Sequence, residues 1–296
     1  MYGLTKFGYK YPSVSFITFK LLTQHEDIVV KVKMENKTTG IRHGPRPKAV
    51  GKLERIRRYP VKSMAGKDVD AIYVHETGLN GDRVYAFYDH KSHRKSLPYF
   101  TGREKRELVL LKPLIIDEPV NTQPYPDGYH PEIKVALPDE NGTYDISDPK
   151  LATHITEICL PRKISITLDY RRAGIFDSNP VSIMGVRTVD QIAGELDQPG
   201  LDPRRFRENF YIDWDSKEPF FEDDLVGKSL QIGEELLLHV VKKNKRCAMI
   251  CLDPDTADYD KHVLGTVAKQ HETNAGVYAV VRQTGVVYKG DPVVIC

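Results

Sequence analysis

Cys247 is the residue whose surroundings in the sequence most favour chemistry. Three lysines and Arg246 crowd residues 242–246 just before it, and an acidic turn at 253–256 follows it. Neighbouring cations favour the thiolate form of a cysteine, which is both the nucleophile and the soft metal ligand. The same residues also fit a small buried thiol on a strand whose lysines face solvent. Local sequence alone favours this second interpretation, so the choice depends on the rest of the chain.

Four loops carry cations beside hydrogen-bonding groups, which suits a phosphorylated and highly polar ligand. They are Lys62 with Ser63, Asp82 with Arg83 in a glycine-bearing turn, Thr101 with Arg103, and Arg207 with Asn209. An arginine can bind two phosphate oxygens at once, and an amide can bind the edge of a heterocycle. Each cluster alone is weak evidence, because surface cations are mostly solvated and Asp82 can simply pair with Arg83.

Composition limits the classes of protein that fit. The chain has 296 residues, of which 40% are hydrophobic and 28% charged, as in an ordinary soluble globular protein. Its 43 basic and 41 acidic residues give a net charge of only +2, so we expect neither a nucleic-acid partner nor an anionic membrane surface. No segment is apolar for long enough to span a membrane. Four scattered cysteines fit a reducing cytosol better than a disulfide scaffold, which predicts a cytoplasmic protein.

Cys251 follows Cys247 by four residues, a spacing that on a helix would bring the two sulfurs to one face. The apolar and β-branched flanks predict a strand instead, on which the two residues would lie about 13 Å apart. A zinc pair is therefore not expected, and the histidines show no metal-ligand spacing either.

Residues 1–47 differ from the rest of the chain. The first 24 residues contain lysines but no acid, and residues 35–48 are polar, basic and rich in turn formers. Low acidity with spaced positive charge is typical of a targeting extension, so targeting to an organelle stays open. Equally, Met34 can be the natural start, with an extra strand or a flexible arm before it.

From residue 50 the pattern predicts many short strands and few helices. Expected strands cover residues 52–59, 69–74, 84–88, 108–114, 209–214 and 230–242, with a hairpin at 132–146. Expected helices cover 148–159, capped by Ser147 and Asp148, and 188–196, 203–208 and 262–271. These elements predict an α+β, predominantly β fold of two packed β-barrel-like lobes with a few short helices.

The expected organisation has three parts: an extension at 1–47, an N-terminal β-barrel domain at 48–147 and a second domain at 148–296. Folds of this kind place sites in the loops between lobes.

Several motifs together resemble the MOSC superfamily. They are YPVKS at 59–63, GxxGDR at 78–83, TGR at 101–103, FRxN at 206–209, FxED at 220–223, RC followed by DPDT, and GxVYxGDPV at 285–293. Their order matches a MOSC-associated N-terminal barrel followed by a MOSC domain, over about residues 50–296. Within the superfamily the chain looks most similar to the mitochondrial amidoxime reducing component and its bacterial relatives.

The resemblance implies that the chain binds the molybdenum cofactor, molybdopterin, and reduces N-hydroxylated compounds by oxygen-atom transfer at a Cys-ligated molybdenum. Cys247 would be the metal ligand and a catalytic residue, and Asp177 would face substrate as the acid that donates a proton. Arg246 would help to keep the sulfur ionised. The cofactor-binding residues would be Lys62, Ser63, Arg83, Thr101, Arg103, Ser178, Asn179, Arg207, Asn209 and Arg246.

The sequence departs from the family pattern at several positions. Glu208 stands where proline is usual, Leu225 replaces a common tryptophan, and Asn244 occupies a position that can be cysteine. Ala257 and Asp258 replace the usual glycine after the acidic turn. Glu208 weakens the assignment of the neighbouring phosphate site unless its side chain points away.

The expected partners are a small N-hydroxylated substrate and a separate electron-transfer protein, because the chain has no ferredoxin-like cysteine cluster. No pyridoxal phosphate site is expected. Two other classes stay open: a sulfur carrier or transferase with a persulfide on Cys247, and a non-catalytic protein that binds or delivers the molybdenum cofactor.

Overall fold

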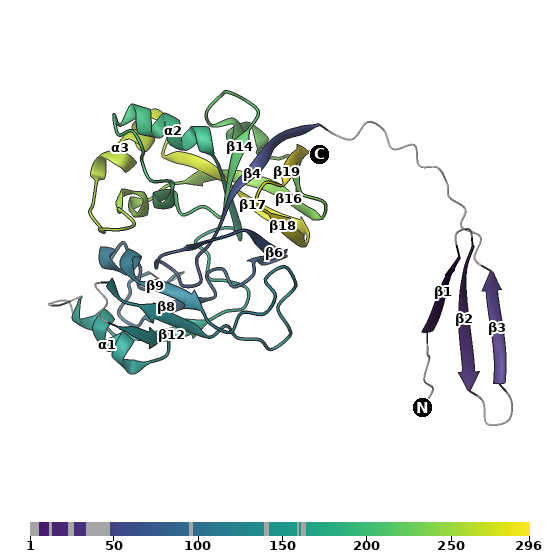
Figure 1. The fold of residues 1–296 in the computed structure, drawn as a ribbon. Helices are drawn as coiled ribbons and strands as arrows, with labels where there is room; N and C mark the ends of the chain where they lie inside the picture. The colour runs from purple at the N-terminus through teal and green to yellow at the C-terminus, as the bar shows by residue number, and fades with distance from the viewer. Residues whose placement is uncertain are drawn as a thin grey trace. The chain divides into compact units, whose positions relative to one another are not determined.

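The computed structural model describes residues 6–11, 14–22, 27–33, 48–94, 97–138, 142–158, 160 and 164–296. The chain divides into two compact units, residues 1–46 and 47–296. In the first unit, β1 (Lys6–Tyr11), β2 (Val14–Leu22) and β3 (Asp27–Lys33) form an antiparallel sheet with β2 in the middle (Figure 1).

A closed seven-stranded barrel dominates the second unit, with the strand order β14-β13-β17-β16-β15-β19-β4 and a return pairing of β4 with β14. Its strands are β4 (Ala49–Arg58), β13 (Val181–Gly185), β14 (Phe210–Trp214), β15 (Ser229–Ile232), β16 (Leu236–Lys245), β17 (Asn274–Gln283) and β19 (Pro292–Ile295). The short β5 (Lys67–Val69) extends the sheet beyond β4. Apolar side chains from all seven strands, such as Leu53, Ile183 and Val293, meet in one core.

The closure of the barrel depends on the close approach of β4 and β14. A Cβ on Gly51 would lie 2.7 Å from the carbonyl oxygen of Asp213, which is closer than real contacts allow. The register of this strand pair also shifts between Tyr211 and Ile212, as at a β-bulge. Glycine and the bulge together let the backbone bend so that the last pair of strands can close the ring.

The second unit also contains three smaller sheets, and Figure 1 shows β8, β9 and β12 with α1 below the barrel. One sheet pairs β8 with β12, the next has the order β11-β10-β9, and the last has the order β18-β6-β7. The strands are β6 (Ala71–His75), β7 (Gly78–Leu79), β8 (Tyr85–Asp89), β9 (Lys112–Ile115), β10 (Ile133–Ala136), β11 (Thr143–Asp145), β12 (Ile166–Tyr170) and β18 (Gly285–Tyr288). A second core, which includes Val61, Phe100 and Leu151, joins the β8-β12 and β11-β10-β9 sheets with α1, whereas buried residues of β6, β7 and β18 belong to the barrel core.

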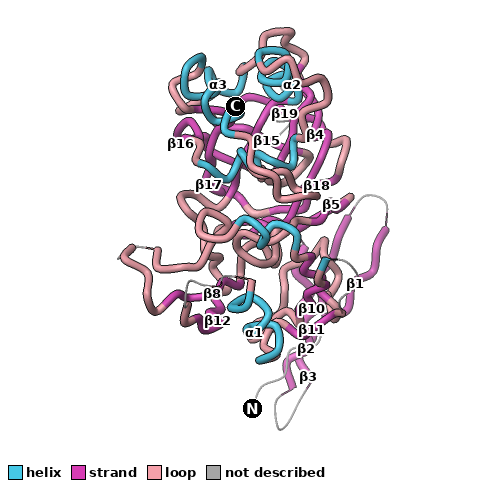
Figure 2. Tube along the Cα trace, turned by 90° about the vertical axis from the view of Figure 1, so that its left-hand side faces the viewer, coloured by secondary structure: helices cyan, strands magenta, loops and turns pink. Residues whose placement is uncertain are grey.

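Helices are short and few in the described part of the chain, as the tube coloured by secondary structure shows (Figure 2). The α-helices are α1 (Pro149–Glu157), α2 (Val186–Glu195) and α3 (Lys261–Gln270), and the 3-10 helices are η1 (Arg106–Leu110), η3 (Pro203–Phe206), η4 (Phe221–Leu225) and η5 (Ala248–Cys251). Asp148 caps α1 by accepting a hydrogen bond from the Lys150 amide, as expected. The predominantly β fold with few helices is confirmed.

Three expected elements were wrong in detail. The strand expected at 108–114 begins as the 3-10 helix η1 and becomes β9 only at Lys112. The strand expected at 230–242 is two strands, because Gly233 adopts a φ of +64° and turns the chain between β15 and β16. The strand expected through Cys247 and Cys251 is the 3-10 helix η5, which follows directly after β16.

The expected domain division at residues 147 and 148 stays a prediction. β4 from the N-terminal side of that boundary is a strand of the barrel, and β12 from the other side pairs with β8. Among the described residues, no helix combines the length and the apolar character needed to cross a membrane.

Candidate functional site

The predicted site residues meet around one cavity of about 290 Å³. They reach it from the ends of barrel strands and from loops of the smaller sheets, although they lie far apart in the sequence. The members are Lys62, Ser63, Arg83, Thr101, Arg103, Asp177, Ser178, Asn179, Arg207, Asn209, Arg246 and Cys247. The geometry therefore brings together all of the predicted catalytic and cofactor-binding residues, while the role of each stays a prediction.

Cys247 lies at the point where the chain leaves β16 and enters η5, with extended backbone at φ −133°. Its side chain is partly exposed and lines the cavity. The guanidinium of Arg103 contacts the sulfur, with Nη2 3.3 Å from Sγ. Arg103 is held in place by Thr101, whose hydroxyl accepts a hydrogen bond from its amide and donates to Glu104. Thr101 thus shapes the turn that carries the arginine.

A chain of charges continues from Arg103 to Lys62 through Asp177. Arg103 Nη2 lies 2.9 Å from Asp177 Oδ2, and Lys62 Nζ lies 2.6 Å from Asp177 Oδ1. Burial raises the pKa of Asp177, but Lys62 and Arg103 outweigh it, so the net shift is downward and the carboxylate stays ionised. Burial lowers the pKa of Lys62, although Asp177 opposes this effect. Asp177 is therefore an anion between two cations, while Lys62 gives up its proton more easily than an ordinary lysine.

This geometry predicts that the contribution of Asp177 to the free energy of unfolding depends on pH. Because its pKa in the folded chain lies below the unfolded value, the contribution is present above about pH 4 and disappears as pH falls through the folded pKa. Urea unfolding at a series of pH values should show Asp177→Asn as less stable than the natural chain near neutral pH. The two should converge toward pH 2, and a difference that does not change with pH would contradict the ion pairs.

Asp82 and Asn209 are buried hydrogen-bond partners, and Asn209 lines the cavity. Asp82 accepts hydrogen bonds from the Tyr59 amide at 2.7 Å and from Asn209 Nδ2 at 3.2 Å, and it pairs with Arg83. Asn209 Oδ1 accepts from the amide and hydroxyl of Ser182 at 3.2 and 3.1 Å. Protein groups thus bind both the oxygen and the nitrogen of the Asn209 side chain, which positions Arg83 and β13. No free amide group of Asn209 is left for the expected contact with a heterocycle.

Arg207 is a cation of the cavity wall without a carboxylate partner among the described residues. Its backbone is left-handed at φ +58°, and its guanidinium lies 4.4 Å from the centre of the Tyr59 ring, which Arg83 also faces at 4.7 Å. No carboxylate or carbonyl of the described residues accepts a hydrogen bond from this guanidinium. Burial lowers the pKa of Arg207 to about 10, and the charges of Arg83 and Arg57 act in the same direction. The guanidinium stays protonated near neutral pH and would gain from a bound anion.

Glu208, the main departure from the family pattern, is fully buried and is not among the residues that line the cavity. Its Oε1 accepts hydrogen bonds from Arg246 Nη1 at 2.5 Å and from Asn244 Nδ2 at 2.9 Å. Burial raises the pKa of Glu208 and Arg246 opposes the shift. The side chain thus lies outside the lining of the cavity, and Glu208 and Asn244, two departures from the family pattern, are hydrogen-bond partners of each other.

The guanidinium of Arg246 donates hydrogen bonds to Glu208 and to the carbonyl of Phe206. The cation that contacts the sulfur of Cys247 is instead Arg103, from a distant loop. Sequence reasoning also missed the roles of Tyr59 and Ser182. The signal for Ser182 is a hydroxyl in the otherwise apolar strand β13, and that for Tyr59 is its place beside the Lys62 loop.

The family comparison agrees with the motifs. Residues 170–294 match the model of the MOSC domain family. The expected resemblance to a MOSC domain is therefore confirmed for this part of the chain. MOSC domains are associated with molybdenum cofactor binding.

Solved structures resemble the chain only distantly. The YUAD protein from Bacillus subtilis is 14% identical with a TM-score of 0.43, covering 83% of this chain and 94% of that one. YiiM from Geobacillus stearothermophilus is 18% identical with a TM-score of 0.31, covering 40% and 54%. A hypothetical protein is 12% identical with a TM-score of 0.40, covering 83% and 69%. No curated protein matches the sequence.

The residues around the cavity fit a molybdenum cofactor. A thiol opens onto the cavity and is suited to a soft metal. The guanidinium of Arg207, which has no carboxylate partner among the described residues, is suited to the phosphate of the pterin. The described residues contain no group of three or more His, Cys, Asp or Glu side chains that could hold a metal ion. A metal at Cys247 would therefore need further ligands from a bound cofactor.

Proposed function

We propose that the protein is a molybdenum-cofactor-dependent oxidoreductase that reduces small N-hydroxylated compounds, with Cys247 as the protein ligand of the metal. The observation that carries this proposal is the sulfur of Cys247, which opens onto a cation-lined cavity and lies 3.3 Å from Arg103. A buried structural cysteine would need neither the cavity nor the arginine. Kinship with the mitochondrial amidoxime reducing component is part of the proposal.

The chain's own residues would hold the cofactor at two ends. Cys247 would ligate the metal through its thiolate, and Arg207 with Arg83 would bind the phosphate. Lys62 and Ser63 would contact the pterin between them. When bound, the cofactor would supply two-electron oxygen-atom chemistry, which protein side chains alone do not perform.

Reduction of an N-hydroxylated compound also consumes protons, and the geometry suggests which residue delivers them. Lys62 is the better proton donor, because burial lowers its pKa whereas Asp177 is held as an anion by two cations. Asp177 would then hold Lys62 and Arg103 in place. This changes the expected role of Asp177 from acid to positioning residue.

The remaining assignments are also proposals. The described residues contain no cluster of cysteines for electron storage, so a separate electron-transfer protein would supply the electrons. A cytoplasmic location and the roles of Thr101, Ser178 and Asn179 beside the cofactor rest on the family resemblance.

The test combines metal analysis with an activity assay on the purified chain. We expect about one molybdenum per chain and reduction of an amidoxime or hydroxylamine with an artificial electron donor. Growth in tungstate, which displaces molybdenum, should lower turnover by at least tenfold while the yield of folded protein stays the same.

Other outcomes would favour the competing classes. A chain without molybdenum that carries a labelled persulfide on Cys247 would be a sulfur carrier. A chain with stoichiometric molybdenum and no turnover on either substrate class would be a binding or delivery protein. Either result would overturn the reductase assignment.

A further inference from the structure

A second cavity, of about 360 Å³, adjoins the site, and Arg207 and Met249 line both cavities. It lies among β5, β9, η3 and the acidic turn after η5. The cations on its wall are Arg57, Lys67, Lys112, Arg204, Arg205 and Arg207, whereas Asp255 is the acidic residue that lines it. The sequence motifs assign no role to this second cavity.

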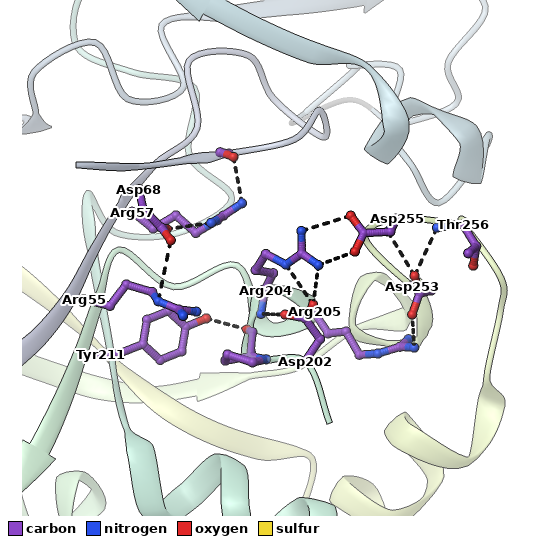
Figure 3. A network of polar contacts seen from close by, with 12 residues as sticks. Arg55, Arg57, Asp68, Asp202, Arg204, Arg205, Tyr211, Asp253, Asp255 and Thr256 are labelled. Atoms are coloured by element: carbon purple, nitrogen blue, oxygen red, sulfur yellow. Dashed lines mark hydrogen bonds and ion pairs between the residues drawn. The ribbon is translucent and has the colours of Figure 1, made fainter. Parts of the chain in front are cut away.

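Three of these arginines are held by neighbouring carboxylates, of which Asp255 lines the cavity, as Figure 3 shows. Arg57 pairs with Asp68 at 2.6 Å, and Arg205 pairs with Asp253 at 2.7 Å. Arg204 holds both Asp202 and Asp255, and so links η3 to the acidic turn. The pairs make a rigid frame, and they neutralise the arginines that form it.

Positive charge is left over on the same wall. Within the part of the chain that the structure describes, no carboxylate lies within ion-pair distance of Lys67, Lys112 or Arg207. Asp255 influences Lys112 from farther away, but its oxygens are bound by Arg204. Three cations that lack an ion-pair partner beside one cavity would suit a polyvalent anion.

The rest of the wall is apolar. Val109, Pro113, Met249 and Leu252 line it, together with Leu114, whose exposed fraction is 44%. A simple inorganic anion would leave this surface in contact with water. A ligand with a phosphate at one end and a flat heterocycle at the other would satisfy both halves, because apolar side chains and arginine planes both pack against bases.

We propose that the second cavity binds a nucleoside phosphate, with its phosphate among Lys67, Lys112 and Arg207 and its base against Met249 and Leu252. The nucleotide can be free, or it can be the end of a longer cofactor whose first part lies beside Cys247. Only the longer cofactor, as the source of the nucleotide, rests on the proposed function. In that case the shared Arg207 would bind the phosphates where the two cavities meet.

Isothermal titration calorimetry on the purified full-length chain tests the site. AMP, CMP and GMP are the probes. Inorganic phosphate and the three corresponding nucleosides, which are the two halves of each nucleotide, are titrated separately. We expect at least one nucleotide to bind at least tenfold more tightly than either of its halves. Lys67→Glu and Lys112→Glu should each weaken it at least tenfold. Lys228→Glu makes the same charge change at an exposed position outside both cavities and should change affinity less than twofold.

Mass spectrometry of the isolated protein separates the two sources. A nucleoside monophosphate released by denaturation alone indicates a free nucleotide, and one released only after pyrophosphate hydrolysis indicates a longer cofactor. No nucleotide binding, or binding unchanged in Lys67→Glu and Lys112→Glu, would overturn the inference even if molybdenum is present. Nucleotide binding by a chain without molybdenum would instead support the second site and contradict the proposed reductase function.

Discussion

Replacing Cys247 by alanine is expected to lower both bound molybdenum and reductase turnover at least a hundredfold. Losing residues that only orient a metal ligand costs about 10–100-fold in affinity or activity, so losing the ligand itself should cost more. The fold should survive, because the Cys247 side chain is partly exposed and the buried residues of η5 are Ile250 and Cys251. Metal analysis, the amidoxime assay and circular dichroism on the same preparation check the three parts of this expectation.

Cys296→Ala is the matched control. It removes a free thiol that is exposed and that lies outside the residues lining the cavity, so metal content and turnover should match the natural chain. Cys251 is a poorer control because it is buried and its loss would disturb packing. If Cys247→Ala keeps its molybdenum and its activity, Cys247 is not the ligand.

Arg246→Ala is expected to reduce the free energy of unfolding by about 3–5 kcal/mol, the usual cost of removing one partner from a buried ion pair. Glu208 is fully buried and the Arg246 side chain is only 7% exposed, so water cannot replace the lost guanidinium. One oxygen of Glu208 already has no hydrogen-bond partner among the described residues. Urea unfolding at neutral pH measures the change.

The control for this pair is Arg171→Ala, which breaks an exposed ion pair with Asp169. It should cost less than about 1 kcal/mol, as solvent-exposed pairs do. Adding Glu208→Gln to Arg246→Ala should recover part of the lost stability, because it removes the buried charge. Equal losses for Arg171→Ala and Arg246→Ala would show that Glu208 and Arg246 are not a buried pair.

The sequence predicts the composition of the site better than its internal contacts. The motifs around Lys62, Arg83, Arg207 and Cys247 combine cations and hydroxyls with turn formers, and loops at strand ends are where a β fold gathers such groups. The convergence of these loops on one cavity follows from the fold. Contacts such as Arg103 with Cys247 join residues 144 positions apart, and no local pattern encodes them.

The errors have physical causes too. Apolar residues at 108–110 suit a strand, but in the structure they pack into the core as a 3-10 helix before the chain reaches β9. Gly233 breaks the expected strand at 230–242, since a positive φ suits a turn and not a ladder. The orientation of the Glu208 side chain depends on its contacts with Arg246 and Asn244. These residues come close to Glu208 only because the barrel is closed.

The central claim is that the sulfur of Cys247 binds molybdenum, and X-ray absorption at the molybdenum edge tests it most directly. The account predicts three sulfur neighbours of the metal in the natural chain, two from the pterin dithiolene and one from Cys247. In Cys247→Ser, any metal that is retained should show two sulfur neighbours and one additional oxygen. Three sulfur neighbours in both proteins, or two in both, would contradict the account.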